Sequence, residues 1–186
     1  MLAIRKIHEK DRFIEAAYRI VSRYGFEELT VKRLSTYLQI STQPIYLNFK
    51  GIQEVKDEVI KRMFKETVYS MRTNINKEDL LHSAVVQLVE YYLANPNIYQ
   101  ACWLDVNGNP VLTYQLFENI FLFRLLTNEG FSELTEEEKK QLFRRIIFVL
   151  LGMMQYVSIQ TASSEEEIEQ LSAKMLEDLL PEHSIL

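Results

Sequence analysis

The sequence predicts an all-α protein of about nine helices, with a small three-helix domain over residues 1–50 and a larger helical domain over residues 51–186. Three observations support this fold class. Among the 186 residues there are only five glycines and four prolines, so helix-breaking residues are few. Apolar residues recur every three or four positions along most of the chain, and few stretches alternate as a β-strand requires. Compact turn signals such as Asn95-Pro96-Asn97 separate the periodic segments.

The first domain is predicted from apolar helical faces and the residues that bound them. A first helix is expected over residues 11–24, ended by Gly25 in a left-handed conformation. Thr30 is expected to cap a second helix. The turn Gln39-Ile40-Ser41 then leads into a third, shorter helix that ends near Phe49. Two short helices joined by such a turn, and braced by a longer helix, form a helix-turn-helix arrangement.

The second domain is predicted from start and stop signals along the rest of the chain. The expected helices cover residues 52–74, 78–94, 98–104, 110–128, 136–162 and 165–180. Pro110 suits the first position of a helix, where its missing N–H is not needed. Thr135 with Glu138, and Ser164 with Glu167, form two capping boxes. These boxes indicate where the last two helices begin.

Charge and cysteine content limit the classes of function. Residues 1–50 carry nine Lys and Arg against five Asp and Glu, a net of +4, and because the whole chain has a formal net charge of −5, residues 51–186 carry −9. A basic N-terminal domain favours a polyanionic partner. The single cysteine, Cys102, excludes an internal disulfide framework and fits a reducing compartment. The N-terminus lacks the apolar core of a signal peptide, and the longest apolar run, residues 146–159, is shorter than the ~20 residues of a membrane span. A soluble, cytoplasmic protein with no membrane partner is therefore expected.

The segment FIEAAYRIVSRYGFEELTVKRLSTYLQISTQPIYLNFKG combines several motifs at a specific spacing. These motifs are Ala16-Ala17, Tyr24-Gly25-Phe26, Thr30-Val31, Leu34-Ser35, Ile40-Ser41 and Ile45-Tyr46 followed by Phe49. Together they resemble the DNA-binding region of the tetracycline-repressor (TetR) family of bacterial transcriptional regulators, over about residues 11–65. The remaining chain matches that family in the number and length of its helices. The resemblance implies a helix-turn-helix that binds double-stranded DNA.

The third helix is the expected reading element, because a recognition helix enters the major groove with its N-terminal residues toward base edges. Thr42 and Gln43 lie there, and hydroxyl and amide groups can read bases. The family pattern assigns a phosphate contact to Tyr46, and Thr30 and Lys50 are the expected phosphate clamps. The candidate DNA-binding residues are Thr30, Lys32, Arg33, Thr42, Gln43, Pro44, Tyr46, Leu47, Asn48 and Lys50. In another helical protein, Gln43 and the basic residues of this set would be ordinary solvated side chains.

Two positions depart from the family pattern. Many members carry glycine in the turn where this chain has Gln39, and a non-glycine residue with left-handed backbone costs ~1 kcal/mol. Members often open the fourth helix with a Ser-Lys pair, whereas this chain has Gly51-Ile52. Lys50 is the candidate to replace the missing lysine.

The middle of the chain is rich in aromatic residues, which suits a cavity for an apolar or aromatic small molecule. In the TetR family the second domain holds such a cavity, and ligand binding there changes the separation of two DNA-binding heads. The residues assigned to the cavity are Tyr91, Trp103, Tyr114, Phe117, Phe121 and Tyr156. Plain core packing also produces aromatic stripes at helical spacing. Cys102, beside Trp103, is either a redox sensor or, more simply, a small core residue.

The last two helices carry an apolar surface that is wider than one core needs. The residues assigned to a dimer interface are Phe143, Ile147, Leu150, Leu151, Met154, Leu171, Met175 and Leu179. Members of the resembled family are two-fold dimers that bind palindromic sites, so the resemblance implies a homodimer. The core of a monomer could absorb this stripe instead.

These features predict a transcriptional regulator, in the commoner family behaviour a repressor, that a small-molecule effector releases from a palindromic operator. An enzyme is not expected, because the chain has no GxSxG, P-loop or GxGxxG motif. Its three histidines lack metal-ligand spacing, and no cofactor or metal is implied. The alternative is a helical adaptor that binds a protein partner and no DNA. Salt-dependent binding to duplex DNA separates these two classes.

Overall fold

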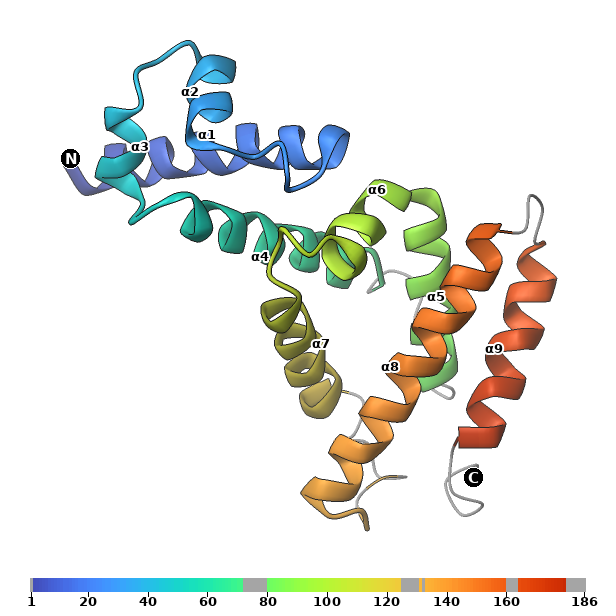
Figure 1. The fold of residues 1–186 in the computed structure, drawn as a ribbon. Helices are drawn as coiled ribbons and strands as arrows, with labels where there is room; N and C mark the ends of the chain where they lie inside the picture. Colours follow the sequence, from blue (N-terminus) through green and yellow to red (C-terminus); the bar gives the residue numbers. More distant parts are fainter. Residues whose placement is uncertain (1, 72–79, 125–130, 132, 160–163, 180–186) are drawn as a thin grey trace. The chain divides into compact units, whose positions relative to one another are not determined.

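The computed structural model describes residues 2–71, 80–124, 131, 133–159 and 164–179 (Figure 1). All regular secondary structure in these residues is helical, which confirms the predicted all-α class. The α-helices are α1 (Leu2–Tyr24), α2 (Val31–Leu38), α3 (Gln43–Asn48), α4 (Ile52–Met71), α5 (Leu80–Ala94), α6 (Pro96–Tyr99), α7 (Pro110–Arg124), α8 (Glu136–Ile159) and α9 (Glu165–Leu179). A π-helical segment, η1 (Gln100–Leu104), continues α6.

The helix bounds differ from the sequence prediction mainly at the N-terminus and around residue 100. α1 begins at Leu2 rather than Asp11, because no glycine, proline or capping residue lies between them. α6 begins at Pro96, a residue that suits a first helical turn. The π-helical segment η1 follows it directly. The predicted helix ends or starts at residues 74, 78, 128, 162 and 180 lie outside the described residues.

Side-chain caps begin three helices where the sequence places them. Thr30 Oγ1 accepts a hydrogen bond of 3.1 Å from a backbone N–H in the first turn of α2. Before α8, Glu138 N donates to Thr135 Oγ1 at 3.3 Å, and Thr135 N donates to Glu138 Oε2 at 2.8 Å. The Thr135 hydroxyl also holds the pKa of the Glu138 carboxyl below its usual range. Before α9, Glu167 N donates to Ser164 Oγ at 3.2 Å.

The chain divides into two compact units. Unit 1 comprises residues 1–66 and 95–114, and unit 2 comprises residues 67–94 and 115–186. The boundary predicted after residue 50 separates the part of the chain expected to bind DNA from the part expected to bind an effector and to dimerise. The compact units divide it by packing, and they place the first part of α4 in the same unit as α1, α2 and α3.

Unit 1 is built around the apolar faces of its N-terminal helices. Ala17 of α1, Leu34 of α2 and Ile45 of α3 are each 0% exposed. The rings of Phe13 and Phe49 meet edge to face, with 6.0 Å between their centroids. Because α3 has only six residues, it is too short to be stable alone. Burial of Ile45, which contributes about 1.5–3 kcal/mol, therefore helps to hold α3 in place.

Unit 2 is a helical layer in which α5 packs against α8 and α9, and α8 packs against α9 (Figure 1). Tyr92 of α5 and Phe143 and Leu150 of α8 are each 1% exposed. The rings of Phe121 and Phe143 lie 5.1 Å apart between centroids. The apolar residues of α8 thus form the core of a single chain.

Cys102, on η1, is a core residue of unit 1. It is 3% exposed, and its Sγ lies 3.9 Å from Met63 Sδ. Burial raises the pKa of the Cys102 thiol to about 12. A reactive cysteine needs a lowered pKa and solvent access, so the structure favours the core role over the redox sensor.

Gln39, where many members of the resembled family carry glycine, has a left-handed backbone, with φ 56° and ψ 42°. Among the residues that the structure describes, it is the one non-glycine residue with positive φ. Its N–H donates to the carbonyls of Ser35 and Thr36 and so ends α2. The turn is therefore closed by a residue that bears a steric cost there.

We expect Gln39→Gly to raise the free energy of unfolding by up to about 1 kcal/mol. Glycine adopts the left-handed conformation without steric cost, although its greater freedom in the unfolded chain offsets part of the gain. Chemical denaturation followed by circular dichroism measures the change. Gln39→Ala is the matched control, because alanine keeps the steric cost. A glycine variant that is no more stable than the wild type would show that the turn is not strained.

Candidate nucleic-acid interface

α3 separates its side chains into a buried face and an exposed face. Ile45 is 0% exposed, and Phe49, directly after the helix, is 3% exposed. Tyr46 and Leu47, by contrast, are 59% and 67% exposed. Two adjacent large side chains therefore lie on the outward face of this short helix.

The N-terminal end of α3 presents polar groups. Thr42, just before the helix, has a helical backbone (φ −74°, ψ −20°), and its side chain makes no capping hydrogen bond. Gln43 is exposed and Pro44 is half-buried. Because the first turn needs no N–H at Pro44, that residue leaves no donor unpaired. The hydroxyl and the amide can therefore exchange hydrogen bonds with base edges.

Asn48 differs from the other predicted DNA-binding residues. Its Nδ2 donates to the carbonyl of Pro44 at 2.9 Å, and its Oδ1 is buried. A polar side chain can bond back to the carbonyl four residues earlier in a helix, and Asn48 does so here. The expectation that Asn48 faces DNA does not fit this geometry.

Two of the predicted phosphate contacts lie in the first turn of α2. Lys32 is exposed. The Arg33 side chain is 46% exposed, and its guanidinium lies 5.1 Å from the centroid of the Tyr24 ring and 3.9 Å from Glu28. Arg23 approaches the same ring at 5.4 Å. The ring orients Arg33 while leaving its donors accessible, as a phosphate contact requires.

The junction between α3 and α4 brings two lysines to one carboxylate. Lys50, whose side chain is exposed, donates its backbone N–H to Glu54 at 2.7 Å. Lys10 of α1 donates from Nζ to the same carboxylate at 3.2 Å. The backbone N–H of Lys50, and then Lys10, hold the pKa of Glu54 below its usual range.

An ionic network joins α1 to α4 within unit 1. Arg62 of α4 forms ion pairs with Glu15 of α1 and with Glu66, and Tyr18 donates its hydroxyl to Glu66 at 2.6 Å. Arg19 pairs with Glu15 at 2.8 Å and, with Arg62, holds the pKa of Glu15 below its usual range. Because that pKa is lowered, the stabilisation is present above the usual carboxyl range and is lost as the pH falls through the lowered pKa. Each exposed pair is weak, but together they orient α1 against α4.

Asp105, directly after η1, fixes the chain between α1 and α2. Its Oδ2 accepts a hydrogen bond from Phe26 N at 2.7 Å, and its Oδ1 accepts one from Asn107 N at 2.8 Å. Gly25 has φ +81°, and a Cβ there would lie 3.2 Å from Asp105 Oδ2. A Cβ on Gly108 would lie 2.9 Å from the Phe26 ring. Two glycines and one carboxylate thus hold the segment that leads to Thr30 and α2.

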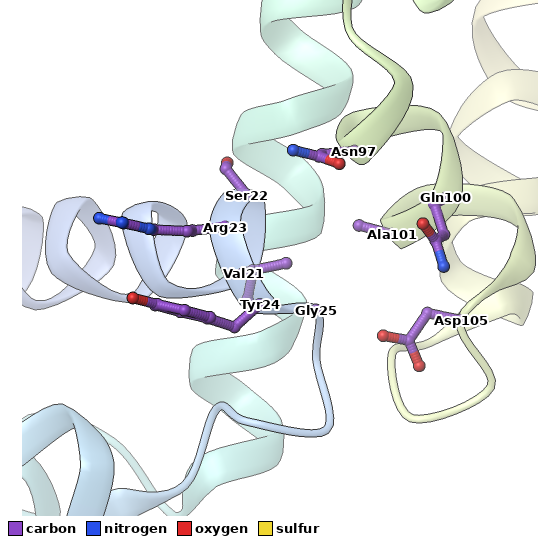
Figure 2. Close-up of a pocket in the computed structure, with 9 residues that line it drawn as sticks. All are labelled: Val21, Ser22, Arg23, Tyr24, Gly25, Asn97, Gln100, Ala101 and Asp105. Atoms are coloured by element: carbon purple, nitrogen blue, oxygen red, sulfur yellow. The ribbon is translucent and has the colours of Figure 1, made fainter.

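A pocket of about 230 Å³ lies beside this contact, between the end of α1 and the segment from Asn97 to Asp105 (Figure 2). Its lining residues are Val21, Ser22, Arg23, Tyr24, Gly25, Asn97, Gln100, Ala101 and Asp105. None of the six residues assigned to the effector cavity lines it. This pocket of unit 1 is therefore not the effector cavity predicted from the sequence.

The six aromatic residues assigned to the effector cavity are divided between the units. Unit 1 contains Trp103 and Tyr114, and unit 2 contains Tyr91, Phe117, Phe121 and Tyr156. Phe117 and Phe121 are buried at 6% and 8% exposure, whereas Tyr156 is 51% exposed. Tyr156 thus lies on an open surface of α8, so its assignment to an enclosed cavity does not fit this structure.

Most residues assigned to a dimer interface lie in the core of unit 2. Exposure is 9% or less for Phe143, Ile147, Leu150, Met154 and Met175. Leu151, Leu171 and Leu179 are half-buried. The physical reason is that α5 packs on α8 and α9, so the core of one chain absorbs much of the stripe. The open face of α8 instead carries Phe148 (72% exposed), Gly152 and Tyr156.

Two other kinds of site are absent from the described residues. No group of three or more His, Cys, Asp or Glu side chains in them is placed to bind a metal ion. A membrane-crossing helix is also absent from this part of the chain, since none of its helices combines the necessary length and apolar character.

Sequence reasoning missed the residues that position the candidate interface. Asp105 and Phe26 are 79 positions apart in the chain, and Lys10 and Glu54 are 44 apart. The Asn107-Gly108 pair indicates a turn, but the neighbouring sequence does not indicate that this turn contacts the end of α1. Such pairings need the tertiary fold.

Comparisons with known proteins support the fold. No protein-family model matches the sequence, and no curated protein matches it. Solved structures do match. The fatty acid degradation regulator FadR from Bacillus halodurans aligns with a TM-score of 0.64 and 16% identity over 94% of this chain and 95% of that chain. A proposed transcriptional regulator from Saccharomonospora viridis, solved with choline, has a TM-score of 0.56 and 18% identity, covering 90% of this chain and 95% of the other. A TetR/AcrR-family regulator from Thermobifida fusca has a TM-score of 0.53 and 12% identity, covering 90% and 96%. The chain has the fold of TetR/AcrR-family regulators.

We expect Asp105→Ala to lower the free energy of unfolding by about 1–3 kcal/mol, because the N–H of Phe26 loses a charged acceptor. Thermal denaturation measures the loss. Glu27→Ala removes a nearby exposed carboxylate and serves as the control, with an expected change below about 0.5 kcal/mol. Equal losses in the two variants would contradict the role given to Asp105.

Proposed function

We propose that this chain is a sequence-specific DNA-binding transcriptional regulator that reads its site with α3. The observation that carries the proposal is the division of α3 into a buried face, Ile45 with Phe49, and an outward face, Tyr46 with Leu47. Thr42 and Gln43, at the N-terminal end of α3, offer a hydroxyl and an amide, which suit base edges. The net charge of +4 over residues 1–50 suits the phosphate backbone.

Around α3, the proposed phosphate contacts are Thr30, Lys32, Arg33, Tyr46 and Lys50. All five are exposed, and they lie on or beside α2 and α3. Phosphate contacts set the register of a protein on the duplex, while base contacts supply sequence preference. We therefore assign affinity to the basic residues and preference to Gln43 with Thr42. Pro44 and Leu47 are assigned apolar contacts in the groove.

The regulator is further proposed to act as a homodimer on a palindromic operator. Phe148, Gly152 and Tyr156 follow one another at intervals of four residues, so they share one face of α8. A Cβ on Gly152 would meet nothing within 4 Å, so a second helix can approach closely there. An exposed apolar face with a small residue at its centre suits helix packing between two copies.

The proposal extends to repression that a small molecule relieves. A ligand that binds more tightly to a form of the dimer unable to fit its operator lowers DNA affinity by its differential binding energy. Buried aromatic side chains such as Phe117 and Phe121 suit an apolar ligand. The regulator from Saccharomonospora viridis, of similar fold, was solved with choline, a cation that aromatic rings can hold. Titrating candidate ligands into the protein–duplex complex tests this step.

The double variant Gln43→Ala/Tyr46→Ala is expected to lose specific DNA binding, because it removes a base contact and a phosphate contact. About 1–3 kcal/mol for the base contact alone corresponds to a roughly 5- to 150-fold rise in Kd. Selection of bound duplexes from a random library first supplies the site, and fluorescence anisotropy then measures Kd. Helicity by circular dichroism should be unchanged.

Tyr69→Ala/Gln115→Ala is the matched control, since it removes an exposed tyrosine and an exposed glutamine from α4 and α7. Its Kd should equal that of the wild type. Retained operator affinity in the α3 variant would refute the contact assignment. Failure of the wild type to bind any duplex in a salt-dependent manner would refute DNA binding and favour the helical adaptor.

Phe148→Glu is expected to shift the protein from dimer to monomer, because it places a charge within the apolar face of the proposed interface. Sedimentation velocity measures the change. Val106→Glu, at a position in unit 1 that is 84% exposed, is the control and should leave the dimer intact. A Phe148→Glu protein that remains dimeric would show that two copies associate elsewhere.

A further inference from the structure

The junction between α3 and α4 holds a cation from α1 that no role described above uses. Lys10 Nζ lies 5.0 Å from the centroid of the Phe49 ring and 3.2 Å from Glu54 Oε1. The Lys10 side chain is 37% exposed and the Glu54 side chain 31%. The first three residues of α4 are Ile52, Gln53 and Glu54, so this helix begins without a basic residue of its own. The positive charge of the junction comes from Lys10 and Lys50.

The ring of Phe49 fixes where the Lys10 ammonium lies. Phe49 is 3% exposed and directly follows the last residue of α3, so a cation over its ring lies beside the end of that helix. An ammonium over an aromatic face is attracted by the ring. Lys10 is thus held at the end of the proposed recognition helix, although it belongs to α1.

The two carboxylate oxygens of Glu54 accept hydrogen bonds from two different donors at this junction. Oε1 accepts from Lys10 Nζ, and Oε2 accepts from the backbone N–H of Lys50 at 2.7 Å. A DNA phosphodiester also carries one negative charge over two free oxygens, and lysine ammonium and backbone N–H groups are common donors to it. The donors that hold Glu54 are therefore donors of the kind that hold phosphate.

We propose that Lys10 and the backbone N–H of Lys50 bind a DNA phosphate beside α3, and that Glu54 competes with this phosphate for the two donors. The inference rests on the DNA-binding function proposed above and adds a contact that the recognition helix itself does not supply. A partly exposed ion pair is weak, so the Lys10 ammonium can exchange Glu54 for another anion. Release of a counterion from the duplex favours the phosphate as that anion. Glu54 then lowers the affinity for DNA, because the phosphate must displace it from these donors.

A purely structural role for Lys10 gives a different result. If Lys10 served only to join α1 to α4, Lys10→Gln would lower the salt dependence of DNA binding no more than Lys61→Gln, which removes the same charge from a similar exposed ion pair. As a phosphate contact, Lys10 adds to affinity while Glu54 subtracts from it. The two substitutions then act in opposite directions, and only the loss of Lys10 lowers the dependence on salt.

The test measures the binding of each full-length variant to a random-sequence duplex of about 30 base pairs, at several salt concentrations, by fluorescence anisotropy. A random sequence suffices because phosphate contacts are independent of sequence. Lys10→Gln is expected to weaken binding and to reduce the slope of log K against log salt by about 0.9. Glu54→Gln is expected to tighten binding by roughly two- to fivefold at low salt. Lys10→Arg keeps the charge and should restore the slope.

Lys61→Gln is the matched control, because Lys61 forms a similar exposed pair with Glu58 on α4, at 3.0 Å, and should leave the slope unchanged. Circular dichroism confirms that each variant is folded. An unchanged slope in Lys10→Gln, or weaker binding in both Lys10→Gln and Glu54→Gln, would overturn this inference while leaving DNA binding by the wild type intact. A wild type that binds no duplex would overturn both this inference and the proposed function.

Discussion

The candidate interface depends on the burial of Ile45 and Phe49 under a helix that cannot stand alone. A helix of six residues gains too few internal hydrogen bonds to offset the entropy of ordering it. Its two apolar anchors, which are 0% and 3% exposed, attach it to unit 1. Because helical spacing is fixed, anchoring this face determines the opposite one, and Tyr46 and Leu47 project outward. The orientation of Tyr46 and Leu47 follows from the packing of Ile45 and Phe49.

Unit 1 then fixes α3 relative to the other elements through contacts between distant parts of the chain. Asp105 holds the start of the segment between α1 and α2, and Arg62 joins α1 to α4. Much of this holding is ionic and partly exposed, so each contact is individually weak and depends on pH and salt. The apolar core supplies most of the free energy, whereas these polar contacts select one arrangement of the helices.

How well the sequence predicts each feature depends on whether the cause is local. The Thr135–Glu138 capping box was predictable because it depends on residues within one turn. The helix-turn-helix was predictable because its spacing is local as well. The apolar stripe of α8 was visible, but periodicity cannot show which neighbour covers it. Phe143 and Leu150, which were predicted to lie at a dimer interface, are buried in the core of unit 2. The sequence did not reveal the hydrogen bond from the Asn48 amide to the carbonyl of Pro44, because that amide has several possible partners. It did not reveal the pairing of Lys10 with Glu54, because the two residues lie on different helices.

The burial of Cys102 limits the reactions that this thiol can undergo. With a pKa of about 12, roughly one thiol in a hundred thousand is ionised at neutral pH. Peroxides and electrophiles react with the thiolate, so their attack on Cys102 must wait for the core of unit 1 to open. Oxidation of Cys102 is therefore slow for as long as unit 1 stays folded.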